Sequence, residues 1–359
     1  MNRLMKMCVS LMVCAAVIVL QPLAARANPL DPYIQAAKKE GAVKIGVTLR
    51  SKVHGKPAGE LYIKAFQKRY PFLKVDFKRI GGPRDRERII SEMVSGLVDW
   101  DVATLSETMI PTIMESKLTR ILDWEKLGVN KVLTHPYNFG VYLRSMVFGI
   151  AYNRNLVSDE EARKFTWETC TDPKWKGKSG MHVRPRHLNR LVMEDAWGRE
   201  KTLDYAKRWA ANVPGIEHSR ATAASKLTAG AYHIFCGETR DQVLDLQVFG
   251  EAKSIGIVFP EPVPVGLGEL VFVPDKAKHP NAGILFLAWT GTREAQNILD
   301  QINFSGHPAF EGNEITEVLK GKQLSMATWK DSLHADEDLA EIVKAMGMPI
   351  VRTQTKKKK

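Results

Sequence analysis

Cysteine is scarce in this sequence, with four residues in 359. Cys8 and Cys14 lie close to the N-terminus, so only Cys170 and Cys236 lie in the body of the chain. Two cysteines are too few for the disulfide framework that holds small secreted domains together. They form either one bridge or two buried thiols, and the sequence leaves both open. The chain also has no Cys-x-x-Cys pair and no zinc-ligand spacing.

Long hydrophobic runs are missing as well. The apolar run from Met7 to Leu20 has 14 residues, whereas a membrane-spanning helix needs about 20. The longest later run, from Ala282 to Trp289, has eight residues. We therefore expect the body of the chain to be soluble.

The first 27 residues have the layout of a cleavable secretory signal peptide. Arg3 and Lys6 precede the apolar run, and Ala25-Arg26-Ala27 closes it with small residues at both positions that define cleavage. We expect the signal peptide to cover residues 1–27, and the mature chain to begin at Asn28 and to work in the periplasm.

Two alternatives to cleavage at this point are an uncleaved anchor and a lipoprotein. The interruption at Gln21-Pro22 disfavours the anchor because it ends the apolar run early. A lipoprotein would be cleaved before Cys14, where Val13 stands in place of the small residue that is needed.

Motifs of exported enzymes are absent too. The sequence has no Gly-x-Ser-x-Gly, no His-Glu-x-x-His, and no Ser-x-x-Lys with the partners that a β-lactamase needs. His182, His187 and His233 are scattered, and lone histidines are more often structural than catalytic. We therefore expect no enzyme activity, no cofactor and no metal, and keep an exported hydrolase as an alternative.

Positive charge is what the chain does have, with a formal net charge of +12. The signal segment and the four lysines of residues 356–359 account for part of it, and residues 28–355 keep +5. One interpretation is a solubility charge with a disordered basic tail at 356–359. The other is a positive cleft that concentrates an anionic solute. An exported protein rarely meets nucleic acid, so we expect no nucleic-acid partner.

Hydrophobic periodicity in the first part of the mature chain predicts an α/β fold. Strands are indicated at 43–49, 73–80 and 101–105, and helices at 58–70 and after Pro83. Strand and helix alternating in this rhythm indicate a parallel sheet covered on both faces.

A second set of elements follows Tyr152. Strands are expected at 180–183, 232–236, 254–259 and 269–273, and helices at 188–197, 200–212 and 239–249. The last 80 or so residues are expected to be mostly helical, most clearly at 284–299.

Five short motifs occur in a recognisable order. They are Glu40-Gly41-Ala42-Val43, Phe66-Gln67-Lys68-Arg69-Tyr70-Pro71, Gly149-Ile150-Ala151-Tyr152-Asn153, Asp172-Pro173-Lys174-Trp175-Lys176-Gly177-Lys178 and Lys278-His279-Pro280-Asn281-Ala282. In this order and spacing the chain resembles the periplasmic solute-binding proteins of ATP-driven (ABC) importers, in particular the ferric-iron-binding-like group. The resemblance covers essentially the whole mature chain.

The resemblance implies a type 2 periplasmic binding fold of two α/β lobes that close on a ligand like a hinge. Residues 28–148 and 260–355 would form the first lobe, and residues 149–259 the second. A monomer that delivers a small solute to an inner-membrane ABC permease is the implied function. A sensory binding protein is an alternative because its capture step is physically identical.

Ligands of open α/β sheets bind beyond the carboxyl ends of the strands. Hydroxyls, glycines and arginines at such ends suit an anion, because guanidinium groups and backbone N–H groups then point the same way. The candidate ligand-binding residues are Thr48, Arg50, Ser51, Arg84, Ser106, Arg184, Arg186, Thr239 and Arg240. Alternatives are that Thr48 and Ser51 only cap a helix, and that the arginines lie on solvated faces.

The chain also lacks a pair of adjacent tyrosines. Ferric-binding relatives carry such a pair just after the segment corresponding to 231–238, because Fe³⁺ prefers phenolate oxygens. This chain has Thr239-Arg240 there, and none of its eight tyrosines are adjacent. The resemblance therefore implies a phosphorylated or carboxylated organic anion as the solute, and ferric iron or an iron complex is the alternative.

Overall fold

The structure is a computed structural model that describes residues 28–49, 52–53, 56–80, 83–105, 113, 116–248 and 252–349. The expected signal peptide (1–27) and basic tail (356–359) lie outside the described residues. Within the described ranges, no helix combines the length and apolar character needed to cross a membrane.

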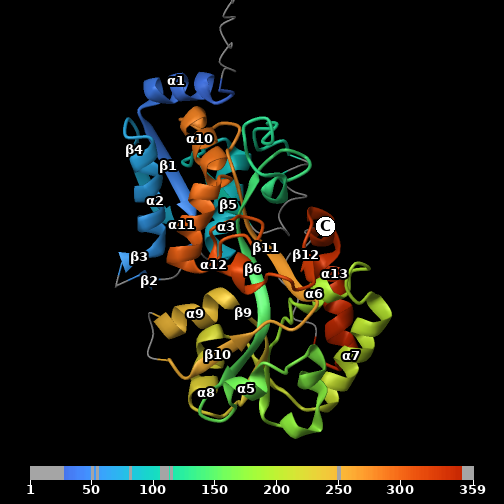
Figure 1. The fold of residues 1–359 in the computed structure, drawn as a ribbon. Coiled ribbons are helices and arrows are strands. Elements are labelled where there is room, and N and C mark those ends of the chain that lie inside the picture. The colour runs from blue at the N-terminus through green and yellow to red at the C-terminus, as the bar shows by residue number, and fades with distance from the viewer. Residues whose placement is uncertain are drawn as a thin grey trace, which may run out of the picture.

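A small parallel sheet forms one side of the first lobe. β1 (Ala42–Val47) and β4 (Lys74–Arg79) pair in parallel, and a parallel bridge joins Ile45 to Val102. Val102 leads into β5 (Ala103–Leu105), which pairs with the long strand β11 (Val263–Phe272). The described part of this lobe also contains helices and a two-stranded ribbon (Figure 1): α1 (Asp31–Glu40), α2 (Ala58–Arg69), α3 (Pro83–Ser95), α10 (Pro280–Thr290), α11 (Arg293–Asn303), α12 (Glu314–Val318), β2 (Lys52–Val53) and β3 (Lys56–Pro57).

The long strand β6 (Val141–Asn153) connects the lobes. It pairs with β11 over its first half and with β9 and β10 over its second half. It therefore crosses from one lobe to the other without a break (Figure 1). Every residue of β6 except Met146 is buried, as expected for a strand covered on both faces. β12 (Leu324–Met326) runs parallel to β11 on its other side.

The second lobe continues the same sheet in the order β6-β9-β7-β8. β9 (Ile234–Thr239) lies parallel to β7 (Ser179–His182), and β8 (Gly215–Glu217) is parallel to β7 on the far side. β10 (Ile255–Val258) pairs with β6. The main flanking helices are α5 (Asp159–Ala162), α6 (Leu188–Leu191), α7 (Arg199–Ala211), α8 (Arg220–Thr228) and α9 (Arg240–Val248).

Each lobe has its own aromatic core. In the first lobe, Tyr62, Phe66, Phe286 and Trp289 contact one another between α2 and α10. In the second lobe the core gathers Trp167, Trp175, Tyr205 and Trp209. A disulfide between Cys170 and Cys236 joins the 3₁₀ turn η3 (Trp167–Thr171) to β9 inside this core. The two cysteines therefore form one bridge, which settles the choice that the sequence left open.

The last helix belongs with the second lobe. α13 (Trp329–Ala345) packs on α6 and α7, and its Ile342 lies in the second lobe's core. Ion pairs to the arginines of that lobe hold it there, including Arg190 with Asp331 at 2.8 Å. α13 therefore contacts elements of residues 149–259, whereas the lobe boundary expected from the sequence, which stays a prediction, gave all of 260–355 to the first lobe.

Three element boundaries also differ from the sequence prediction. The helix expected at 284–299 is two helices, because Gly291 ends α10 and the Thr292 hydroxyl caps α11. The helix expected at 188–197 is the single turn α6. The strand expected from 269 begins at Val263, within the proline-rich segment, because its pairing with β6 and β12 overrides local propensity.

Candidate functional site

The candidate site lies where the carboxyl ends of the two sheets approach the lobe boundary. β1 runs toward the second lobe (Figure 1) and ends at Val47, next to the candidate Thr48. In the second lobe, β7 and β9 are parallel, so His182 and Thr239 end at one edge. Thr239 pairs with Phe148 in the middle of β6, which places this edge at the crossing between the lobes.

A bulge at Gly237 shapes the end of β9. The pairing of β9 with β6 slips by one residue here, because Gly149 faces Glu238 while Ile150 faces Cys236. Gly237 has a φ of 79°, which suits glycine, and a Cβ there would lie 2.0 Å from His187 Nδ1. The bulge lets the strand run on to Thr239, three residues beyond the predicted end, and directly into α9.

Arg240, the first residue of α9, is buried and held by first-lobe groups. Its Nη1 donates to Asp300 Oδ1 at 2.6 Å and to the Phe304 carbonyl at 2.9 Å. Its Nη2 donates to Glu314 Oε2 at 3.0 Å. The side chains of Arg240 and Asp300 are each 3% exposed, whereas that of Glu314 is 66% exposed. Arg240 thus reaches across the lobe boundary, and one of its two carboxylate partners remains open to solvent.

A second buried arginine lies on the crossing strand β6. Arg144 donates to both carboxylate oxygens of Glu269 on β11, and its Nη1 donates to Asp241 Oδ2 at 3.1 Å. Asp241 is the neighbour of Arg240, so α9 begins with two oppositely charged residues that are both paired with buried groups. The two carboxylates raise the pKa of the Arg144 guanidinium against the opposing effect of burial, which is the largest single influence on it.

A polar pair lies at the same edge of the second lobe. His182 Nε2 and Glu238 Oε2 are 2.9 Å apart, and Glu238 also accepts a hydrogen bond from the backbone N–H of Thr239. The Thr239 hydroxyl is buried and has no hydrogen-bond partner among the described residues.

The remaining candidate residues are distributed more widely. Thr48 is buried and its hydroxyl donates to the Ile80 carbonyl, so it ties the ends of β1 and β4 together. Arg184 pairs with Asp336 of α13 at 3.2 Å, while its buried Nε has no partner among the described residues. Arg186 and Arg84 are exposed. Arg50, Ser51 and Ser106 lie outside the described residues.

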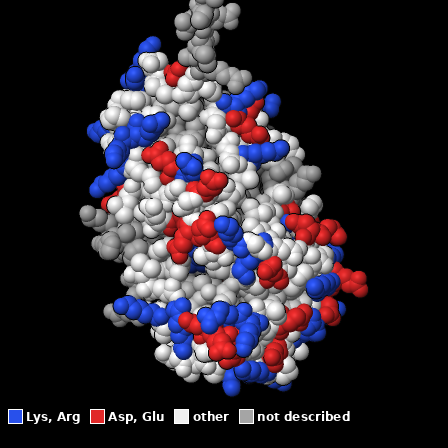
Figure 2. Space-filling view, in the orientation of Figure 1, with Lys and Arg blue, Asp and Glu red and all other residues white. Residues whose placement is uncertain are grey.

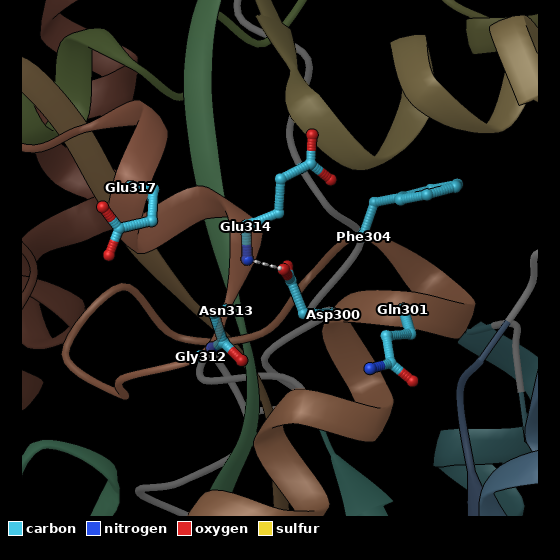
Figure 3. A pocket seen from close by; sticks show the side chains of 7 residues that line it. All are labelled: Asp300, Gln301, Phe304, Gly312, Asn313, Glu314 and Glu317. Carbon is cyan, nitrogen blue, oxygen red and sulfur yellow. Dashed lines mark hydrogen bonds between the residues drawn. The ribbon is translucent and has the colours of Figure 1, made fainter.

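A cavity of about 380 Å³ opens beside the Arg240 cluster. It is lined by Asp300, Gln301, Phe304, Gly312, Asn313, Glu314 and Glu317. Figure 3 shows the Asp300 carboxylate pointing to the backbone N–H of Glu314, 2.7 Å away, with Glu317 on the opposite side of Glu314 from Asp300. The volume of this cavity is within the range of small-molecule binding sites.

The charges around this cavity are mixed. Asp300, Glu314 and Glu317 are acidic, and the Arg240 guanidinium lies against the first two. On the face drawn in Figure 2, basic and acidic side chains are also interspersed rather than separated. An anion at this boundary would therefore be recognised by individual arginines and not by a broad positive field.

Five residues of the two clusters were missed from the sequence: Arg144, Asp241, Glu269, Asp300 and Glu314. A signal for one of them exists, because Gln296, Asp300 and Asn303 recur at helical spacing on the buried face of α11. Polar side chains on a buried helix face need partners, so this pattern predicts a buried polar contact. It does not predict which residue makes that contact.

Buried histidines of both lobes are kept neutral. His187 stacks on Trp167, and burial lowers its pKa to about 3, with a smaller contribution from His182. Burial likewise lowers the pKa of His135 and of His307 to about 4. Neither ring nitrogen of His187 has a hydrogen-bond partner among the described residues. The three rings are therefore unprotonated near neutral pH and are weak bases.

The described part of the chain contains no group of three or more His, Cys, Asp or Glu side chains that could hold a metal ion.

Comparison with known proteins gives a consistent result for the fold. A family model of bacterial extracellular solute-binding proteins matches residues 62–312. A comparison with curated protein sequences finds no match.

Solved structures of two-lobed binding proteins superpose on nearly the whole chain. The iron- and citrate-bound protein IdiA (FutA) from Trichodesmium is 20% identical, with a TM-score of 0.67 over 86% of this chain and 100% of that one. Iron-bound HitA from Pseudomonas aeruginosa is 18% identical, with a TM-score of 0.63 over 85% and 99%. The spermidine/putrescine-binding protein PotD from Streptococcus pneumoniae is 14% identical, with a TM-score of 0.57 over 85% and 99%. At these identities the likeness concerns the fold alone. Two of these relatives contain iron, whereas the third is named for polyamines.

Proposed function

Because the chain belongs to the family of bacterial extracellular solute-binding proteins, we propose that it is the periplasmic receptor of an ABC importer. In this proposal it captures a small phosphorylated or carboxylated organic anion between its lobes and delivers it to an inner-membrane permease. The function is binding, without turnover of the solute.

The proposal of an anionic solute rests mainly on the position of Arg240. This guanidinium belongs to the first residue of α9 and reaches across the lobe boundary. It is bound by Asp300 and Glu314, two of the first-lobe residues that line a cavity of about 380 Å³. In the ferric-binding relatives that the sequence resembles, the corresponding segment holds the tyrosine pair that binds iron. A guanidinium in that segment repels a cation and forms charge-assisted hydrogen bonds with a phosphate or carboxylate.

Two further donors support the same ligand chemistry. The buried Thr239 hydroxyl and the buried Nε of Arg184 both lack partners among the described residues. Buried donors without partners are costly, and a bound acceptor group would satisfy them. Thr48, Arg84 and Arg186, with Arg50, Ser51 and Ser106 outside the described residues, complete the proposed set of ligand contacts.

The connections between the lobes allow a hinge motion. β6 crosses the boundary as one continuous strand, and the chain returns beside it through β10 and then β11, which pair with the second-lobe and first-lobe halves of β6. Rotation about these strands would open and close the site around the solute. Because α13 packs on α6 and α7, it would move with the second lobe.

Native mass spectrometry of the protein purified from its own periplasm tests the proposal. Receptors of this kind release solute slowly when closed, so we expect a retained small molecule with at least one phosphate or carboxylate. A retained cation or neutral sugar would contradict the anion, and saturable hydrolysis of ester or phosphoester substrates would contradict a binding role.

Ferric iron is the alternative ligand, and titration with iron distinguishes it from an anionic solute. Burial raises the pKa of Tyr62 and of Tyr205, so these phenols resist becoming the phenolates that Fe³⁺ requires. We expect no phenolate-to-iron absorption band on addition of ferric citrate. A strong band that persists against excess citrate would establish iron binding instead.

A further inference from the structure

The two carboxylate partners of Arg240 differ in a way that suggests different roles. Asp300 is buried to the same extent as Arg240, and its second oxygen accepts the backbone N–H of Glu314. Glu314 reaches the guanidinium from the surface, with two thirds of its side chain in solvent. Both carboxylates bind the Arg240 guanidinium. Only Glu314 can leave it without becoming an unpaired buried charge.

We propose that the Glu314 carboxylate is an internal substitute for the anionic group of the solute. In the ligand-free protein it occupies Nη2 of Arg240, and an incoming phosphate or carboxylate takes that place while Asp300 stays on Nη1. This inference rests on the proposed function and identifies Glu314 as the residue against which every anionic solute must compete.

The geometry allows the exchange with little rearrangement. The Glu314 backbone remains anchored because its N–H is bound to Asp300 at 2.7 Å, so only the side chain has to swing away. Asp300, Phe304 and Glu314, which all accept hydrogen bonds from the Arg240 guanidinium, also line a cavity (Figure 3), and in this proposal the solute group enters from that cavity. The released carboxylate returns to water, where it is already largely solvated.

The exchange has a consequence for specificity. A weakly held internal carboxylate blocks solutes that interact with Arg240 less well than it does, such as neutral molecules and cations. It also keeps the buried guanidinium paired when no solute is present. Affinity for the correct anion is reduced in return, because each binding event must displace Glu314.

Isothermal titration of inorganic phosphate into the full mature chain tests this inference, because phosphate is a minimal anionic probe. Glu314→Gln keeps the size of the side chain and removes the competing charge, so we expect it to bind phosphate about five- to tenfold more tightly than the wild type. Glu314→Ala is a second removal of the carboxylate and should show a gain in the same range.

Glu317→Gln is the matched control. Glu317 lines the same cavity but has no contact with Arg240, its recorded partner being Lys320 at 3.8 Å. Its neutralisation removes the same charge from the cavity, and we expect only about a twofold gain from the weaker repulsion. Thermal unfolding of all three variants checks that each is folded.

Three results would overturn the exchange. Equal gains in the Glu314→Gln and Glu317→Gln variants would show a general field effect, and unchanged phosphate affinity in Glu314→Gln would show no competition. In both cases phosphate binding by the wild type leaves the proposed function intact. Failure of Glu314→Gln to bind phosphate at millimolar concentration would also overturn the exchange, and the proposed function would then be decided separately by the solute retained from the periplasm.

Discussion

The two buried arginines near the lobe boundary have the same kind of partners but different surroundings. Arg144 lies on the crossing strand with Asp241 and Glu269, and all three side chains are about one tenth exposed. Arg240 lies at the start of α9 with one buried partner, Asp300, and one exposed partner, Glu314. The first cluster is sealed, whereas the second opens into a cavity.

This difference indicates a structural role for the Arg144 cluster and a role in ligand recognition for the Arg240 cluster. A sealed ion pair cannot exchange partners without leaving a charge in the interior, so the Arg144 cluster serves to fix β6, β11 and α9 relative to one another. Glu269 supports this role, because it has a φ of 41°, which a residue with a side chain adopts only when its surroundings hold it there. An open pair can exchange, so the Arg240 cluster is suited to a ligand.

Removing the sealed arginine should have the largest effect. Arg144→Met leaves Asp241 and Glu269 buried without a cation, which costs about 3–5 kcal/mol in the free energy of unfolding. Urea unfolding followed by circular dichroism measures it. Arg208→Met is the matched control, because Arg208 also pairs with two carboxylates but is 43% exposed, and we expect it to cost about 1 kcal/mol or less. Equal losses of unfolding free energy in the two variants would show that the Arg144 cluster is not sealed from solvent.

Replacing Asp300, the buried partner of Arg240, should lower the free energy of unfolding by a smaller but measurable amount. Asp300→Asn keeps an acceptor for Arg240 and loses the charge, so we expect the free energy of unfolding to fall by about 1.5–3 kcal/mol. Glu314→Gln removes the exposed partner of the same guanidinium and should cost about 0–1 kcal/mol. Similar losses in these two variants, measured by urea unfolding at pH 7, would show that the partners are equivalent and would remove the basis for exchange.

His187 extends the comparison to a buried basic side chain with no carboxylate partner in the described residues. Its pKa is about 3 in the folded protein, against about 6.5 in the unfolded chain, so below pH 6.5 the unfolded chain binds a proton that the folded protein does not. The free energy of unfolding should therefore fall as the pH drops from 6.5 toward 3, with a loss of about 2 kcal/mol from His187 at pH 5. His187→Phe should show a shallower decline between pH 7 and pH 5, and an identical decline would contradict a neutral buried His187.

Most of the fold could be predicted from the sequence because its elements are periodic and well punctuated. The alternation around 43–105 gave β1, α2, β4, α3 and β5 within a few residues, and Gly41 ends α1 with a φ of 66°. The position of α13 could not be predicted, because its attachment to the second lobe depends on pairs such as Arg190 with Asp331 that are 141 residues apart. The extension of β9 to Thr239 also escaped prediction, because it depends on a bulge at Gly237.

The candidate site was predicted only in part, for a related reason. Arg240 was identified because it follows a strand in the second lobe, and the structure places it at the lobe boundary. Its partners Asp300 and Glu314 come from α11 and α12 (Glu314–Val318), more than 50 residues away, and local patterns do not show such pairs. Arg184 was identified in the same way, and its pairing with Asp336 on α13 was equally hidden.

Isothermal titration of the solute identified by native mass spectrometry measures whether Arg240 recognises an anion. Arg240→Ala should bind that solute about ten- to a hundredfold more weakly than the wild type, because a charge-assisted hydrogen bond is lost. Asp300→Asn perturbs the same cluster but keeps the guanidinium, so it controls for structural damage and should retain binding. A loss of less than about threefold in Arg240→Ala, with Arg184→Ala behaving likewise, would show that these arginines do not contact the solute and would contradict the account.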